Sequence, residues 1–82
     1  MPRVTVRYHA LLREKTSRES EVFELSSLAS AGDLISAFAK KYPSFERLAA
    51  SLHVAVNDEI ISRTQILRDN DRVDLMPPFG GG

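Results

Sequence analysis

A single helix-forming stretch, residues 31–42, stands between segments that otherwise have the pattern of strands. Its apolar residues recur at helical spacing and form one stripe, which comprises Leu34, Ala37, Phe38 and Tyr42. The charged residues lie mostly outside this stripe. Ser30 is a candidate N-cap, and Asp33 follows three residues later as in a capping box. Pro43 ends the helix because the residue before a proline avoids the helical conformation. One helix covers only one face of a sheet, so the other face is expected to stay open.

The strand segments share an alternation of apolar and polar residues, clearest in residues 3–9 and weakest in the short segment 60–61. Residues 3–9 place Val4, Val6 and Tyr8 on one side of the strand. The other, outward side carries Arg3, Thr5, Arg7 and His9. The remaining strands are predicted at residues 21–25, 52–56 and 72–76, with Phe23, Leu25, Val73 and Leu75 inward and Arg72, Asp74 and Met76 outward. Short helical turns are expected at residues 10–15, at residues 44–50 with Ser44 as cap, and, 3₁₀-like, at residues 62–67.

The order of these elements along the chain is strand, strand, helix, strand, short strand, strand. It predicts an α+β fold with a mixed four- to five-stranded sheet packed against one main helix. The first two strands are expected to pair as an antiparallel hairpin. If the first and last strands lie side by side and parallel in the middle of the sheet, the fold is a β-grasp of the ubiquitin-like kind. Periodicity alone leaves that pairing open.

The chain closes on Met76-Pro77-Pro78-Phe79-Gly80-Gly81-Gly82. We expect residues 1–76 to form the domain and residues 77–82 to form a flexible tail. Gly81 and Gly82 have no Cβ, so their backbone can pass a constriction, and the two prolines favour an extended start. Six extended residues span roughly 20 Å. A glycine-rich end alone is equally compatible with a floppy terminus of no function.

Composition narrows the classes of function. Equal numbers of basic and acidic residues, 11 each, argue against a nucleic-acid binder. The absence of cysteine excludes disulfides and any thiol chemistry of the chain's own. The amino-terminal residues show no signal-peptide pattern, and no apolar run approaches the ~20 residues that span a bilayer. A cytoplasmic protein is therefore expected.

Three features together resemble a known family: the turn Val56-Asn57-Asp58-Glu59, the entry into the last strand at Asp71-Arg72-Val73-Asp74-Leu75, and the Pro-Pro tail. Over its whole length the chain resembles the MoaD/ThiS family of ubiquitin-like sulfur carriers, and within it the molybdopterin synthase small subunits. It departs from the family at Gly80, where a residue with a side chain is common, so this tail is looser than usual.

The resemblance implies a chemistry for the tail. The Gly82 carboxylate, next to Gly81, would be adenylated with ATP by an E1-like activating enzyme. A sulfur donor would then convert it to a thiocarboxylate, so sulfur is carried covalently and no cofactor is bound by the chain alone. The molybdopterin synthase large subunit would receive the tail, and the sulfur would go to a pterin precursor of the molybdenum or tungsten cofactor.

Docking residues are expected on the open sheet face near the tail. The candidates are Met76 and the tail residues Pro77, Pro78, Phe79 and Gly80, with Arg13, Arg72 and His9 as polar contacts at the rim. Against this, Met76 and Phe79 can pack on the chain's own surface, and the arginines can be plainly solvated. No metal site is expected, because His9 and His53 lie on separate strands. Asp69, Asp71 and Asp74 are expected to be turn formers or surface charges.

Other functions remain open at this level. The same activated terminus would suit a ubiquitin-like modifier joined to target lysines, or a sulfur carrier for thiamine or cysteine synthesis. A β-grasp interaction module with an inert tail is a further alternative. The sequence shows no nucleophile–base constellation and no phosphate-cradling loop, so catalysis by the chain alone is not expected.

Overall fold

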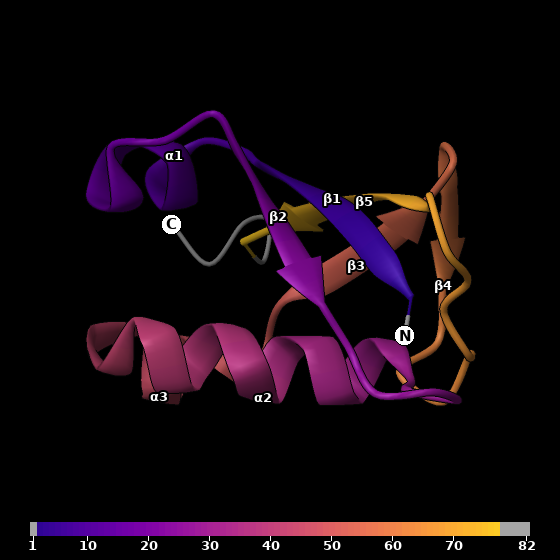
Figure 1. Ribbon diagram of the computed structural model, residues 1–82. Coiled ribbons are helices and arrows are strands. Elements are labelled where there is room, and N and C mark those ends of the chain that lie inside the picture. The colour runs from indigo at the N-terminus through magenta and orange to yellow at the C-terminus, as the bar shows by residue number, and fades with distance from the viewer. Residues whose placement is uncertain (1, 78–82) are drawn as a thin grey trace.

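Figure 1 shows the computed structural model, which describes residues 2–77. A sheet lies on one side of the molecule and the main helix on the other. In chain order the elements are β1 (Arg3–Tyr8), α1 (Leu11–Thr16), β2 (Ser20–Glu24), α2 (Ala31–Lys41), the 3₁₀ turn η1 (Pro43–Phe45), α3 (Glu46–Ala49), β3 (His53–Val56), β4 (Glu59–Ile61) and β5 (Arg72–Met76).

The five strands are ordered β2-β1-β5-β3-β4. β1 and β2 pair antiparallel, as predicted, with α1 in their connection. The first and last strands, β1 and β5, are parallel neighbours near the middle of the sheet, with Tyr8 opposite Leu75. β3 pairs antiparallel with both β5 and β4. The β-grasp pairing, which periodicity had left open, is therefore confirmed.

Helix α2 covers one face of the sheet and closes the core. Ser30 caps it as predicted: its hydroxyl accepts from the Asp33 amide, while the Asp33 carboxylate accepts from the Ser30 amide. The helix ends at Lys41, one residue earlier than predicted, and Pro43 opens the 3₁₀ turn that follows. The side chains buried between helix and sheet include Val4, Val6, Tyr8, Leu12, Leu34, Phe38, Val73 and Leu75.

Two local predictions need correction. Ser44 caps no helix, because it lies inside the 3₁₀ turn and Phe45, which is buried, stands at the N-cap position of α3. Asp74 faces away from α2 as predicted, yet it is only 8% exposed. The predicted turn at residues 62–67 is present as one bond from the Gln65 amide to the Ser62 carbonyl, after which Ile66 bridges Ser30.

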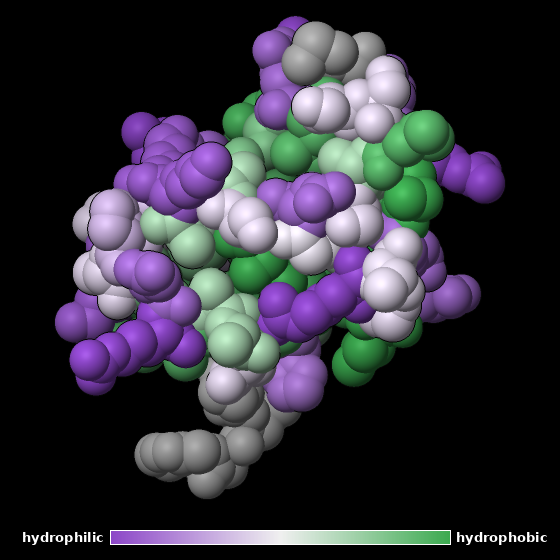
Figure 2. Space-filling model, turned by 90° about the horizontal axis from the view of Figure 1, so that it is seen from below, coloured by the Kyte–Doolittle hydropathy of each residue, from purple (hydrophilic) through white to green (hydrophobic). Residues whose placement is uncertain are grey.

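The sheet face turned away from α2 carries no helix within residues 2–77, which agrees with the open face predicted from the sequence. Figure 2 looks at the opposite, helix side, where polar and apolar side chains are mixed over the surface. Asn57 and Asp58 both have positive φ, as a tight turn between β3 and β4 requires. No helix among the described residues is long and apolar enough to cross a membrane.

Candidate functional site

The tail leaves the fold at the end of β5. Because β5 is held between β1 and β3, its last residues are fixed from both sides: Leu75 lies opposite Tyr8, and Met76 opposite His53. Met76 and Pro77 are both partly exposed. We call the surroundings of these two residues the tail root.

The rest of the tail lies outside the described residues. The predicted roles of Pro78, Phe79, Gly80, Gly81 and Gly82 therefore stay predictions, as does the division into a domain of residues 1–76 and a tail of residues 77–82.

A buried carboxylate marks the open face beside the tail root. His9 Nε2 lies 2.8 Å from Asp74 Oδ1, and Arg7 Nε lies 3.8 Å from the same oxygen. The Asp74 side chain is 12% exposed, whereas those of Arg7 and His9 are 51% and 41% exposed. The two nitrogen-bearing side chains cover the carboxylate from solvent, which explains why an outward-facing aspartate on an open face is buried.

The predicted rim residues occupy two different places. His9 and Arg13 line one hollow of about 240 Å³ between β1 and the start of β2, and Arg7 also contributes to it. Arg72 stands at the opposite end of β5, where it donates to Asp58 at 2.7 Å. Arg72 and Met76 are four residue steps apart along the strand, which is roughly 13 Å. The structure therefore brings His9 close to the tail root through its contact with Asp74, places Arg13 in the hollow beside β1, and leaves Arg72 at the other end of β5.

Arg7 and Asp74 belong to the tail root, although sequence reasoning singled out neither of them there. Asp74 was interpreted as a turn former or surface charge, and Arg7 only as an outward residue of the first strand. Their contact follows from the parallel register, in which Arg7 lies opposite Asp74. The one signal available was that Arg7 and His9 share a face of the first strand.

A second carboxylate, Glu21, holds the elements behind the tail root together. Its Oε1 accepts from the hydroxyls of Tyr8 and Tyr42 at 2.7 and 2.9 Å, and its Oε2 accepts from the Lys41 ammonium. The Glu21 side chain is 6% exposed. The network thereby joins β1 and β2 to the end of α2, next to the strand from which the tail departs, since Tyr8 lies opposite Leu75.

The electrostatics of this network keep it in one protonation state. Burial alone would raise the pKa of Glu21, but the hydrogen bonds from Lys41, Tyr8 and Tyr42 outweigh it and hold that pKa below its ordinary value. Burial and the bond to Glu21 raise the pKa of Tyr8, and the same two causes raise that of Tyr42. The carboxylate stays charged and both phenols stay protonated at neutral pH.

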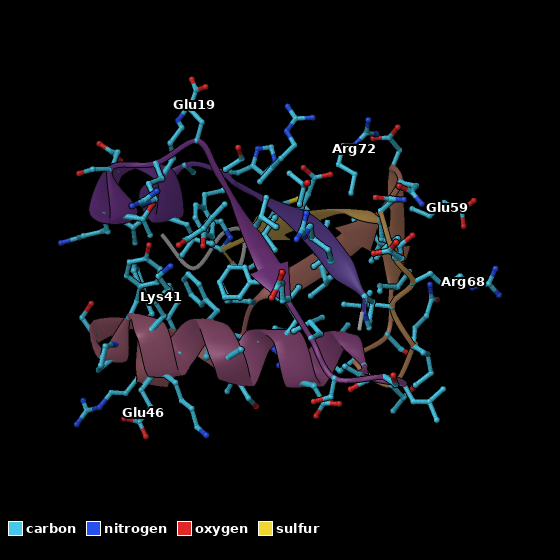
Figure 3. All side chains as sticks on the ribbon, viewed as in Figure 1. Glu19, Lys41, Glu46, Glu59, Arg68 and Arg72 are labelled. Carbon is cyan, nitrogen blue, oxygen red and sulfur yellow. The ribbon has the colours of Figure 1, made fainter. Side chains whose placement is uncertain are left out.

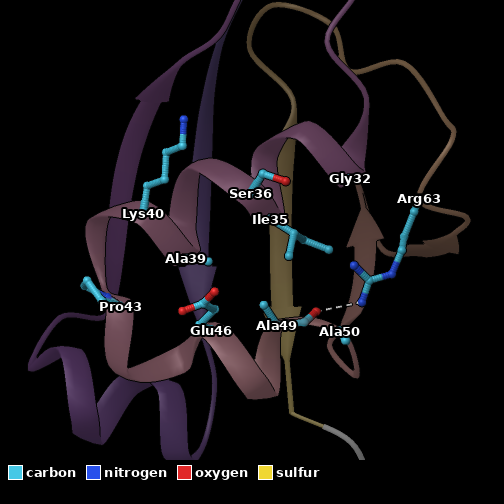
Figure 4. Close-up of a pocket in the computed structure, with 10 residues that line it drawn as sticks. All are labelled: Gly32, Ile35, Ser36, Ala39, Lys40, Pro43, Glu46, Ala49, Ala50 and Arg63. Atoms are coloured by element: carbon cyan, nitrogen blue, oxygen red, sulfur yellow. Dashed lines mark hydrogen bonds between the residues drawn. The ribbon is translucent and has the colours of Figure 1, made fainter.

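A groove of about 530 Å³ lies on the other side of the molecule, between α2 and the turn that carries Arg63 (Figure 4). Its Arg63 guanidinium donates to the carbonyls of Ala49 and Leu52, at 2.8 and 3.1 Å. That arginine ties the end of α3 to the turn, which is a structural role. Among residues 2–77 no group of three or more His, Cys, Asp or Glu is placed to hold a metal ion.

Fold and site together define a ubiquitin-like β-grasp protein whose central strand, β5, ends beside an open sheet face, shortly before the glycine-ended terminus of the sequence. The ThiS family model matches residues 6–82, and the chain belongs to that family. The resemblance seen in the sequence is thereby confirmed.

The similarity to individual relatives extends over nearly the whole chain. This chain is 28% identical over 81 residues to the molybdopterin synthase sulfur carrier subunit of Chlamydomonas reinhardtii, and the match covers 96% of this chain and 98% of that protein. The structure of molybdopterin converting factor, subunit 1, from Pyrococcus furiosus matches with a TM-score of 0.86 at 29% identity, covering 95% and 99% of the two chains. A complex of subunits 1 and 2 of the molybdopterin-converting factor from Helicobacter pylori matches with a TM-score of 0.67 at 22% identity, covering 98% and 99%. This last likeness supports the fold.

Proposed function

We propose that this protein is the sulfur carrier, and thus the small subunit, of a molybdopterin synthase. The observation that carries the proposal is the match, over at least 95% of this chain at 28–29% identity, to a sulfur carrier subunit and to a converting factor subunit 1. The tail root supports it, because a tail that starts from the middle of a sheet begins at a fixed point. The chain supplies the sulfur and relies on partners for catalysis.

The proposed chemistry takes place at Gly82. A carboxylate oxygen attacks the α-phosphorus of ATP in the activating enzyme, and pyrophosphate leaves. A donor then supplies sulfur at the oxidation level of hydrosulfide, which attacks the acyl carbon and displaces AMP; loss of the sulfur-bound proton leaves a thiocarboxylate. With no cysteine in the chain, no side-chain thiol competes for the sulfur. The general acid–base and phosphate-binding groups come from the partners.

We propose that the tail, residues 77–82, is inserted in extended form into the active sites of partner proteins. Pro77 and Pro78 favour an extended start, so less conformational entropy is lost when the tail enters a partner. Gly81 and Gly82 present no side chain, so the reacting carbonyl can be approached closely from all sides. Roughly 20 Å of extended chain is enough to reach a buried active site.

We propose that the activating enzyme and the synthase large subunit both bind the open face around the tail root. Met76 is the adaptable apolar contact, continued by Phe79, with His9 and Arg13 at the rim. The Helicobacter pylori complex supports the large subunit as partner, since it joins subunit 1 to subunit 2. Arg72, away from the root, would contact only a partner that covers the whole length of β5. ATP-dependent activation is consistent with a cytoplasmic location.

Intact-mass measurement tests the proposal. The protein is incubated with ATP, the cognate activating enzyme and a sulfur donor, and we expect the mass increase that accompanies exchange of one oxygen for sulfur, located at Gly82. A variant lacking Gly82 should remain folded, by circular dichroism, and should gain no sulfur. Absence of the mass increase in the full chain would refute the proposal. Lysine-linked adducts in cells that depend on Gly82 would favour the modifier function instead.

A further inference from the structure

Leu28 occupies a conformation that its side chain makes costly. It lies in the connection between β2 and α2, its φ is 64°, and its side chain is 80% exposed. The Ala29 amide donates to the Ser26 carbonyl at 3.1 Å, which closes a turn with Leu28 at the third position. Turns with positive φ at that position favour glycine or asparagine. A leucine at this position is unfavourable for two reasons, because its backbone is strained and because its apolar side chain is exposed to solvent.

The surroundings of Leu28 form a rigid, partly apolar surface. Leu28 and Ile66, which is 45% exposed, line one hollow of about 870 Å³. The two connections that carry them are tied together by backbone bonds of 2.9 Å, from Leu67 to Ala29 and from Ala31 to Gln65. We call Leu28, Ile66 and this hollow the Leu28 patch.

Two opposite charges at the rim of this patch have no partner among the described residues. Glu59 and Arg68 both line the hollow, and neither side chain makes a hydrogen bond or an ion pair there. Figure 3 shows both projecting from the same end of the molecule. Charged neighbours are paired: Arg72 donates to Asp58, and both oxygens of Asp71 accept hydrogen bonds. The patch thus has an apolar centre and one free charge of each sign.

We propose that the Leu28 patch is the surface through which two copies of this chain associate about a two-fold axis. A two-fold interface must be complementary to itself. Leu28 and Ile66 of one copy would meet those of the other, and Glu59 of each copy would meet Arg68 of its counterpart. The net charge of zero adds no general repulsion between copies. Association is expected to be weak, because only two exposed apolar side chains per copy, Leu28 and Ile66, form the centre of the contact.

The Leu28 patch and the tail root lie at different ends of the molecule. In Figure 1 the connection between β2 and α2 lies at the right-hand end of the molecule, whereas β5 runs toward the left and ends there. Both tail roots therefore point away from the interface. The dimer would present two tails to partners at once, and its formation is independent of the proposed sulfur chemistry.

Analytical ultracentrifugation of the full chain tests this inference. We expect the average mass to rise from 9.1 kDa toward twice that value as the concentration increases to about 1 mM. Leu28→Gly should abolish the rise while increasing the melting temperature, because it removes the apolar contact and relieves the strain together. Val22→Thr is the matched control, since Val22 is also apolar and 54% exposed but lies on β2. It should leave the association unchanged.

Charge-reversal variants distinguish the proposed two-fold contact from nonspecific association. Glu59→Arg and Arg68→Glu should each weaken the association at least about tenfold, because each sets like charges against one another. The double variant, carrying both exchanges, should restore it. A chain that stays monomeric at about 1 mM, or a folded double variant that remains as weak as the single ones, would overturn the inference. Sulfur loading, measured on the same variants, should not change in either case.

Discussion

Replacing Glu21 tests whether its network holds the tail root in place. Both tyrosine hydroxyls donate to Oε1, whereas Lys41 donates to Oε2. In Glu21→Gln the amide oxygen can still accept from both tyrosines, but the amide nitrogen faces the Lys41 ammonium as a second donor. In Glu21→Ala all three bonds are lost, and the hydroxyl of Tyr8, a residue only 2% exposed, is left without its acceptor.

The magnitude follows from these bonds. A hydrogen bond to a charged group contributes about 1.5–3 kcal/mol and a neutral one about 0.5–1.5 kcal/mol. Loss of the charge from the two tyrosine bonds, and of the bond from the half-exposed Lys41, is partly offset because a neutral amide is easier to bury. Glu21→Gln should therefore cost about 1–3 kcal/mol. Glu21→Ala should cost about 3–5 kcal/mol, as when one member of a buried pair is removed. The whole domain is expected to have only about 4–12 kcal/mol of stability.

Urea and thermal unfolding measure these costs. Each kcal/mol corresponds to roughly 4–8 °C of melting temperature in a domain of this size. Glu24→Gln is the matched control: Glu24 lies on the same strand, but its side chain is 61% exposed and pairs only with Arg3. It should change the free energy of unfolding by less than about 0.5 kcal/mol. Equal, small losses in Glu21→Ala and Glu24→Gln would refute the role assigned to the network.

The pH dependence gives an independent check with a definite sign. The pKa of Glu21 in the folded protein is held below its ordinary value of 4.5 by its three donors, despite burial. Its contribution to stability is therefore complete above that ordinary value and is lost as the pH falls through the folded pKa. The stability difference between the wild type and Glu21→Gln should be constant near neutral pH and shrink below about pH 4.5. A difference that grows on acidification would contradict the argument.

Two further substitutions test the helix cap and the docking face. Ser30→Ala removes the hydroxyl that accepts from the Asp33 amide, and should lower the free energy of unfolding by about 1 kcal/mol in urea titrations; an unchanged midpoint would show that the cap contributes nothing. Met76→Arg should leave the fold intact and weaken binding to the synthase large subunit at least about tenfold by calorimetry, because a charge replaces an apolar contact. Ser36→Arg, on the outer side of α2, should not affect that binding, and an unchanged dissociation constant for Met76→Arg would refute the docking role of Met76.

Local patterns were sufficient to predict most of the fold. The Ser30 cap, the Pro43 stop and the alternation of residues 3–9 depend on neighbours in the sequence, and the structure confirms all three. Ser44 was mistaken for a cap because serine before a helical segment usually is one. Here Pro43 begins a 3₁₀ turn first, and that turn takes Ser44 into its interior.

Side-chain partners at the candidate site could not be predicted in the same way. The contact of Asp74 with His9 follows from the register between β1 and β5, which no local pattern specifies. The separation of Arg72 from the tail root, by contrast, follows from the length of β5 alone. The Glu21 network depends in addition on where α2 ends relative to β2. Leucine rarely adopts the left-handed conformation that Leu28 has, so sequence propensity would have predicted another backbone conformation at that position.

The parallel pairing of β1 with β5 also determines when the tail root comes into existence. Nearly the whole chain lies between Tyr8 and Leu75, so this contact forms only after the intervening elements have been brought together. Amides at the end of β5 should accordingly be among the last to exchange, opening with the molecule as a whole. A partner that recognises the tail together with its root would thus select folded molecules, because a partly unfolded chain carries the same last residues without the folded surface beside them.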